Sequence, residues 1–157
     1  MSKAWFFITV GLFWAFRSLQ SFSDPNFYDP HNLNDWVALL TFSLAWWLLA
    51  PALLLLPQPP TARWPARLAA AAAVVVGLAN VIEDGLQVDA AGIGYGLGTM
   101  VFLLSFIAMT VLCLARSPRW SAVVLVSTAV GLLQLENGGG VLVLAAWWFA
   151  AWKVRRA

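Results

Sequence analysis

The stretch LAAAAAVVVGLANVIEDGLQ, residues 68–87, joins an apolar run to a polar end. Its first twelve residues carry no polar side chain, as expected of a helix that crosses a lipid bilayer. Its last eight residues include an asparagine, two adjacent carboxylates and a glutamine, all of which are costly to place in lipid. The stretch therefore predicts a membrane helix that contributes one end to a polar layer.

The composition of the whole chain supports a membrane protein. Of its 157 residues, 62% are apolar and only 10% are charged, too few to solvate a water-soluble particle of this size. We predict an all-α integral membrane protein with one domain, residues 1–157, surrounded by membrane lipid and without a nucleic-acid partner. The single cysteine and single histidine argue against an internal disulfide, a Cys/His zinc site and a bis-histidine haem, so no cofactor is expected.

Six hydrophobic segments follow one another along the chain. Their order predicts six transmembrane helices in three consecutive hairpins. A five-helix alternative joins the last two segments, but ENGGG, residues 136–140, is strong turn sequence and favours two helices. The six segments are residues 4–22, 35–56, 67–84, 93–115, 120–136 and 140–154.

Charge placement tests this topology independently. With six spans, every basic residue except Arg17 falls on one side of the membrane, and all seven acidic residues fall on the other. The positive-inside rule then places both termini in the cytoplasm, for a multi-pass protein of the inner (plasma) membrane. The basic residues of the inner side are Lys3, Arg63, Arg67, Arg116, Arg119, Lys153, Arg155 and Arg156. The acidic residues of the outer side are Asp24, Asp29, Asp35, Glu83, Asp84, Asp89 and Glu136.

The polar residues of the opening stretch are spaced for one helical face. Asn80, Glu83, Asp84 and Gln87 follow i, i+3, i+4, i+7 spacing. At a rise of about 1.5 Å per residue, Arg17, Glu83 and Glu136 all lie roughly 21 to 26 Å from the inner ends of their helices. Ionised side chains inside a membrane face the bundle and pair with one another, so we expect Arg17 to be the counter-ion of Glu83 or Glu136.

These residues predict a pocket that opens to the outer side. The loop at residues 23–35 is long enough to cover it, and Trp14 supplies an apolar wall. Clustered carboxylates are suited to general acid–base chemistry. The candidate catalytic residues are Glu83, Asp84 and Glu136. The candidate ligand-binding residues are Arg17, Asn80, Gln87, Trp14, Gln134 and Asn137.

Three functions remain open. The first is a membrane protein that binds a lipophilic small molecule, as an acid–base isomerase or cyclase of an isoprenoid-like substrate whose positive charge aromatic rings would stabilise. The second is a small transporter or solute-uptake component. The third is an accessory subunit whose polar layer only specifies helix pairing. Trp46, Trp47, Trp147 and Trp148 lie deeper than an interfacial belt and form either bulk packing or an aromatic cavity.

The segment GIGYGLG, residues 92–98, places glycines four residues apart. Small residues at this spacing allow membrane helices to approach closely. Gly92, Gly94, Gly96 and Gly98 therefore predict close packing, either inside the chain or in contact with a second copy or another membrane protein.

Overall fold

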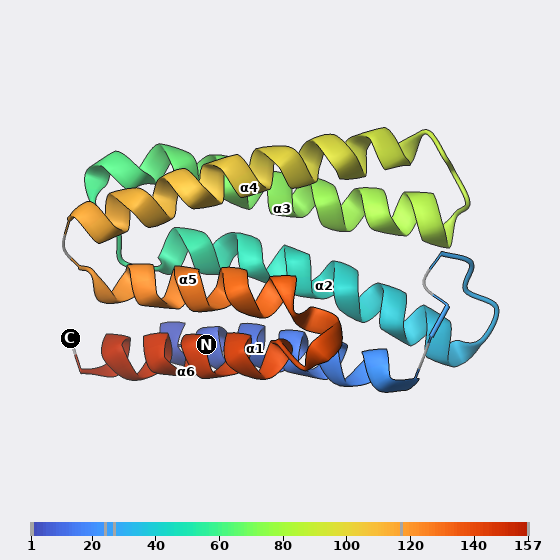
Figure 1. Ribbon diagram of the computed structural model, residues 1–157, viewed down its shortest axis with the longest axis horizontal. Helices are drawn as coiled ribbons and strands as arrows, with labels where there is room; N and C mark the ends of the chain where they lie inside the picture. Colours follow the sequence, from blue (N-terminus) through green and yellow to red (C-terminus); the bar gives the residue numbers. More distant parts are fainter. Residues whose placement is uncertain (1, 24, 27, 117, 157) are drawn as a thin grey trace.

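Six α-helices form the computed structural model, which describes residues 2–23, 25–26, 28–116 and 118–156 (Figure 1). Asp24, one of the predicted outer acids, lies outside these residues. No strand occurs among them, as the all-α prediction requires. The helices are α1 (Lys3–Gln20), α2 (Leu33–Leu55), α3 (Arg63–Asn80), α4 (Ala91–Ala115), α5 (Trp120–Leu133) and α6 (Gly140–Arg155).

Three segments are long and apolar enough to cross a membrane. They are Leu33–Leu55, Pro60–Gly85 and Ala91–Ala115, and their length and composition indicate a multi-pass membrane protein. The second comprises the 3₁₀ turn η2 (Pro60–Ala62), α3 and the π-helical turn η3 (Val81–Gly85).

The last two predicted segments are separate helices. At about 1.5 Å per residue, the 14 residues of α5 extend about 21 Å. The turn between α5 and α6 contains the 3₁₀ turn η4 (Leu135–Asn137) and then Gly138, whose φ of 86° favours glycine. The reading of this region as one helix is therefore wrong.

The helices pack in a ring in chain order, closed by contact between α1 and α6 (Figure 1). The α1–α6 and α3–α4 contacts are the most extensive, and the α4–α5 contact is the least extensive between ring neighbours. Helices α2 and α5 lie across the ring from each other. The ring is thus tight along α1–α6 and loosest between α4 and α5.

The two ends of the bundle differ in charge. The end that holds both termini and the α2–α3 and α4–α5 connections, here called the basic end, carries every described lysine and arginine except Arg17 (Figure 1). The guanidinium of Arg155 lies 5.1 Å from the ring centroid of Trp5, which places the C-terminal and N-terminal segments side by side. The opposite half, called the acidic end, carries the α1–α2 and α3–α4 connections and the described acidic residues.

The α5–α6 turn, which carries Glu136, does not extend as far as the α1–α2 and α3–α4 connections (Figure 1). It docks on α1, where the hydroxyl of Ser18 donates to the backbone carbonyl of Leu135. Gly140 packs against the backbone of Trp14 so closely that a side chain there would overlap it. The short hairpin therefore holds η4 beside the last turn of α1 and leaves the space beyond it to side chains of the longer helices.

The four glycines of α4 do not share one environment. Gly92 lies against the carboxylate of Glu83, Gly94 faces Ala79, and Gly98 faces Val75 and Val76. A Cβ atom at Gly96 would meet no heavy atom within 4 Å. Three glycines thus serve the α3–α4 contact inside the chain. The prediction of contact with a second copy stays untested.

Candidate functional site

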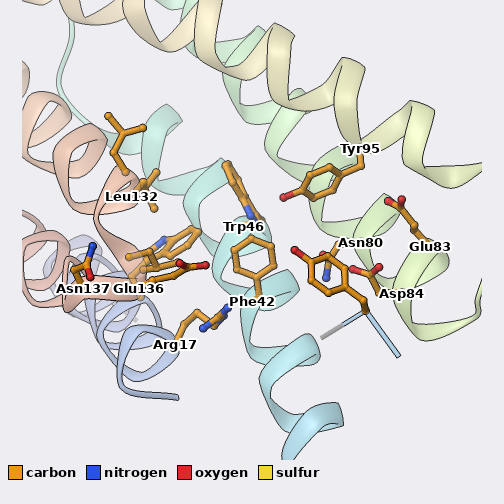
Figure 2. A pocket seen from close by; sticks show the side chains of 14 residues that line it. Arg17, Phe42, Trp46, Asn80, Glu83, Asp84, Tyr95, Leu132, Glu136 and Asn137 are labelled. Atoms are coloured by element: carbon orange, nitrogen blue, oxygen red, sulfur yellow. The ribbon is translucent and has the colours of Figure 1, made fainter. Parts of the chain in front are cut away.

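A cavity of about 590 Å³ lies inside the ring towards the acidic end (Figure 2). Its walls come from α1, the α1–α2 connection, α2, α3, η3, α4, α5 and η4. The α5–α6 turn closes one side of it because that turn docks on α1. The lining residues are Trp14, Arg17, Tyr28, Phe42, Trp46, Asn80, Glu83, Asp84, Tyr95, Leu132, Leu133, Leu135, Glu136 and Asn137.

Seven of the nine predicted site residues line this cavity, and two do not. The seven are Trp14, Arg17, Asn80, Glu83, Asp84, Glu136 and Asn137. Gln134 is exposed on the α5–α6 turn, and its side-chain oxygen accepts a hydrogen bond from Asn137 at 3.1 Å. Gln87 is also exposed and lies outside the lining.

The polar stripe predicted along one helical face is interrupted by a change of helix type. The α-helix ends at Asn80, and residues 81–85 form the π-helical turn η3. Gln87 then takes a left-handed backbone conformation, with φ of 56°. Its side chain turns to the α1–α2 connection and donates to the backbone carbonyl of Tyr28 at 2.9 Å. Gln87 therefore ties this connection to η3, and its expected place on the polar face is wrong.

The π turn presents two adjacent carboxylates to the cavity. Glu83 and Asp84 are both half-buried and both line it. A regular α-helix would separate their directions by about 100°. Figure 2 shows Glu83 and Asp84 on one side of the cavity and Glu136, from η4, on the other. The cavity thus has acidic groups on two facing walls.

Arg17 lies nearer to Glu136 than to the carboxylate pair. Its side chain is buried, its Nη1 atom donates to the hydroxyl of Ser21 at 2.8 Å, and its guanidinium lies 5.4 Å from the Phe42 ring centroid. It is attracted electrostatically to Glu136. No ion pair within 4 Å joins Arg17 to either glutamate among the described residues. Of the two predicted counter-ions, Glu136 is the electrostatic partner of Arg17, acting from beyond ion-pair distance.

Asn80 uses its amide in a helix–helix contact. The amide nitrogen donates to the hydroxyl of Ser43 on α2 at 3.0 Å, and both residues are buried. Next to this contact, Gly77 leaves room for Trp47, whose indole nitrogen donates to the carbonyl of Val74 at 3.3 Å. These hydrogen bonds hold α2 against α3 and fix the wall from which η3 projects.

Aromatic rings form the floor of the cavity. The rings of Trp14 and Trp46 lie edge to face, with centroids 5.5 Å apart, and Phe42 packs edge-on against both. Tyr95 extends from α4 towards the same space (Figure 2). The electron-rich faces of such rings attract positive charge, as the guanidinium of Arg17 over the Phe42 ring illustrates. Trp46 thus belongs to an aromatic cavity, one of the two alternatives for the deep tryptophans.

Several lining residues were not identified from the sequence as site residues. Phe42 lies one helical turn before Trp46, so this i, i+4 pair was a usable signal. The sequence signal for Tyr95 was weaker, because it is only a single polar aromatic residue in the glycine-rich start of a helix. Tyr28 gave none, because it lies in the α1–α2 connection outside any helix. The leucines of α5 and η4 gave none either, because the shortness of the α5–α6 hairpin decides their position.

The cavity carries three acidic side chains and one basic side chain. The described residues contain no group of three or more histidine, cysteine, aspartate or glutamate side chains placed to hold a metal ion. The carboxyl groups of the cavity can form hydrogen bonds and can gain or lose protons.

Comparison of this chain with known protein families, with curated proteins and with solved structures finds no match. Functional inference accordingly begins from the side chains of the cavity.

Proposed function

We propose that this protein binds a lipophilic small molecule in the cavity between α2 and α5 and exchanges protons with it. The main support is the convergence of three carboxylates and an aromatic floor on one space of about 590 Å³, within the usual range for small-molecule sites. Glu83 and Asp84 both line the cavity, where their carboxyl groups can reach a bound molecule.

The chemistry that best fits these groups is isomerisation or cyclisation of an isoprenoid-like molecule. One protonated carboxyl group donates a proton to a carbon–carbon double bond, and the resulting cation lies against the faces of the aromatic rings. A carboxylate on the facing wall then removes a proton from a neighbouring carbon. The molecule gains one proton and loses one, so no oxidant is consumed. The proton passes from one acidic wall to the other, and proton exchange through water restores the two groups before the next turnover.

The weak contact between α4 and α5 supports a lipophilic ligand. The cavity lining includes Leu132 and Leu133 of α5 and Tyr95 of α4, on either side of the loosest contact in the ring. The side chain of Leu133 is 79% exposed. A hydrocarbon chain in the bilayer would reach the cavity between these two helices without crossing water.

A cavity-filling variant tests the proposal. The protein is purified in mild detergent, and its bound small molecules are extracted and identified by mass spectrometry. Leu132→Trp fills the cavity, whereas Val130→Trp places the same ring on the exposed face of α5, away from the cavity. We expect wild type and Val130→Trp to retain a lipophilic molecule that Leu132→Trp loses. An empty wild type, or equal retention by both variants, would argue against the site.

We further propose that all six helices are inserted in the inner (plasma) membrane, with the basic end in the cytoplasm. Support comes from the positive-inside rule and from the separation of basic and acidic residues to opposite ends. The short α5–α6 hairpin then enters from the cytoplasmic side, and its turn lies within the outer half of the bilayer, packed against α1. The cavity opens outwards in this arrangement.

Cysteine labelling in intact cells tests this orientation. Cys113 is the only cysteine and is buried, so Cys113→Ser provides the background. Asp29→Cys and Arg156→Cys then place single thiols at exposed positions of the two ends. A membrane-impermeant maleimide should label Asp29→Cys directly and Arg156→Cys only after permeabilisation. The reverse pattern would invert the proposed topology.

A further inference from the structure

A second cavity, of about 570 Å³, lies at the basic end and is separate from the proposed ligand site. Three basic side chains line it, Lys3 at the start of α1 and Arg63 and Arg67 at the start of α3. The end of α2 and the residues that follow it complete the walls, with Leu54, Leu55, Leu56, Pro57 and Gln58. We propose that this cavity binds the phosphate group of an anionic phospholipid, whose acyl chains lie along α2.

The charge of the cavity favours an anion. Arg63 and Arg67 are four residues apart on one helix, so they project from the same face, and Lys3 reaches the cavity from a different helix. All described acidic residues lie in the other half of the bundle. None of them forms an ion pair with these three cations. The cations therefore have no internal counter-charge among the described residues, and a phosphate would supply one.

The apolar walls distinguish a lipid from a soluble anion. Leu54 and Leu55 are 48% and 36% exposed at the C-terminal end of α2, directly beside the basic side chains. Leu56 is buried and anchors this turn in the core. A soluble phosphate would contact only the cations, whereas a phospholipid would also cover the exposed leucines. One amphipathic anion would thus neutralise the basic side chains and cover the exposed leucines.

Aromatic residues place this cavity at the depth of lipid headgroups. Trp5 and Trp64 are 58% and 69% exposed at the same end of the bundle, as tryptophans of a membrane interface are. The guanidinium of Arg67 lies 5.4 Å from the Trp64 ring centroid, so this cation is held beside an interfacial anchor. Basic pockets at this level of membrane proteins are suited to anionic headgroups.

Native mass spectrometry of the full chain in mild detergent tests the proposal, with phosphatidylglycerol and phosphatidylcholine of identical acyl chains as probes. We expect phosphatidylglycerol to bind more tightly. The double variant Arg63→Gln/Arg67→Gln should weaken its binding by about fivefold per removed charge, roughly 25-fold in total. Arg116→Gln/Arg119→Gln is the matched control, because it removes two charges from the same end but not from the cavity.

Three results would overturn the proposal: equal binding of the two lipids, equal loss in the two double variants, or displacement of phosphatidylglycerol by millimolar inorganic phosphate. The second would indicate only a diffuse positive field, and the third a site for a soluble anion. Lys3→Gln is a further variant that leaves α3 intact, and it should weaken binding about fivefold. Failure of any of these tests leaves the proposed function of the other cavity unaffected.

Discussion

Replacing Glu83 and Asp84 together by glutamine and asparagine should abolish turnover of the bound molecule while the protein still folds. The substitutions keep the size of both side chains and remove only the groups that gain and lose protons. Each positioned acid or base typically contributes about 100- to 10,000-fold to a rate. The measurement is conversion of the molecule identified by mass spectrometry, together with the melting temperature in detergent.

Asp89→Asn is the control for this experiment. Asp89 is exposed at the acidic end and does not line the cavity, so its loss changes the charge of that end without touching the site. Turnover should remain at the wild-type level in this variant. Glu136→Gln, on the facing wall, should lower turnover as the double variant does, because donor and acceptor are both needed.

The same variants separate the competing functions. A transporter would still bind its solute in the amide variants but would show altered pH dependence or coupling of uptake. An accessory subunit would lose yield and thermal stability, because the carboxylates would then serve helix pairing. Normal folding without turnover therefore supports acid–base chemistry, and reduced stability with an empty cavity supports the accessory role.

The order and approximate limits of the helices could be predicted from the sequence because lipid imposes a simple rule. A helix must supply a long apolar run, and polar or turn residues end it, as residues 136–140 do. The constant advance of a helix per residue predicted one depth for Arg17, Glu83 and Glu136. All three line the same cavity.

Other parts of the site depended on tertiary contacts that no local pattern encodes. The π turn η3 breaks the helical spacing after Asn80, so the face assigned to Gln87 was wrong. The shortness of the α5–α6 hairpin leaves Gln134 outside the cavity and creates the space that Tyr95 and Leu132 line. Sequence patterns assign residues to helices. They do not reveal the cavity, because it results from the unequal lengths of those helices.

Substitution of the glycines between α1 and α6 should produce a large loss of stability. A Cβ atom at Gly11 would lie 2.8 Å from the Cα atom of Leu144, and one at Gly140 would lie 2.6 Å from the Cβ atom of Ser18. Both obstacles belong to the facing helix near its backbone, so α1 and α6 would have to separate. Overpacking of this kind typically costs about 1 to 3 kcal/mol.

We therefore expect Gly11→Ala and Gly140→Ala each to lower the melting temperature in detergent by roughly 2 to 12 °C. Gly96→Ala is the matched control, because it adds the same methyl group to a helical glycine with no heavy atom within 4 Å. It should be neutral or stabilise by about 0.5 to 1 kcal/mol. Gly140→Ala should also weaken ligand retention, since the displaced backbone carries Trp14 and the hairpin that holds Glu136. Equal melting of all three variants would contradict the close α1–α6 contact on which the cavity depends.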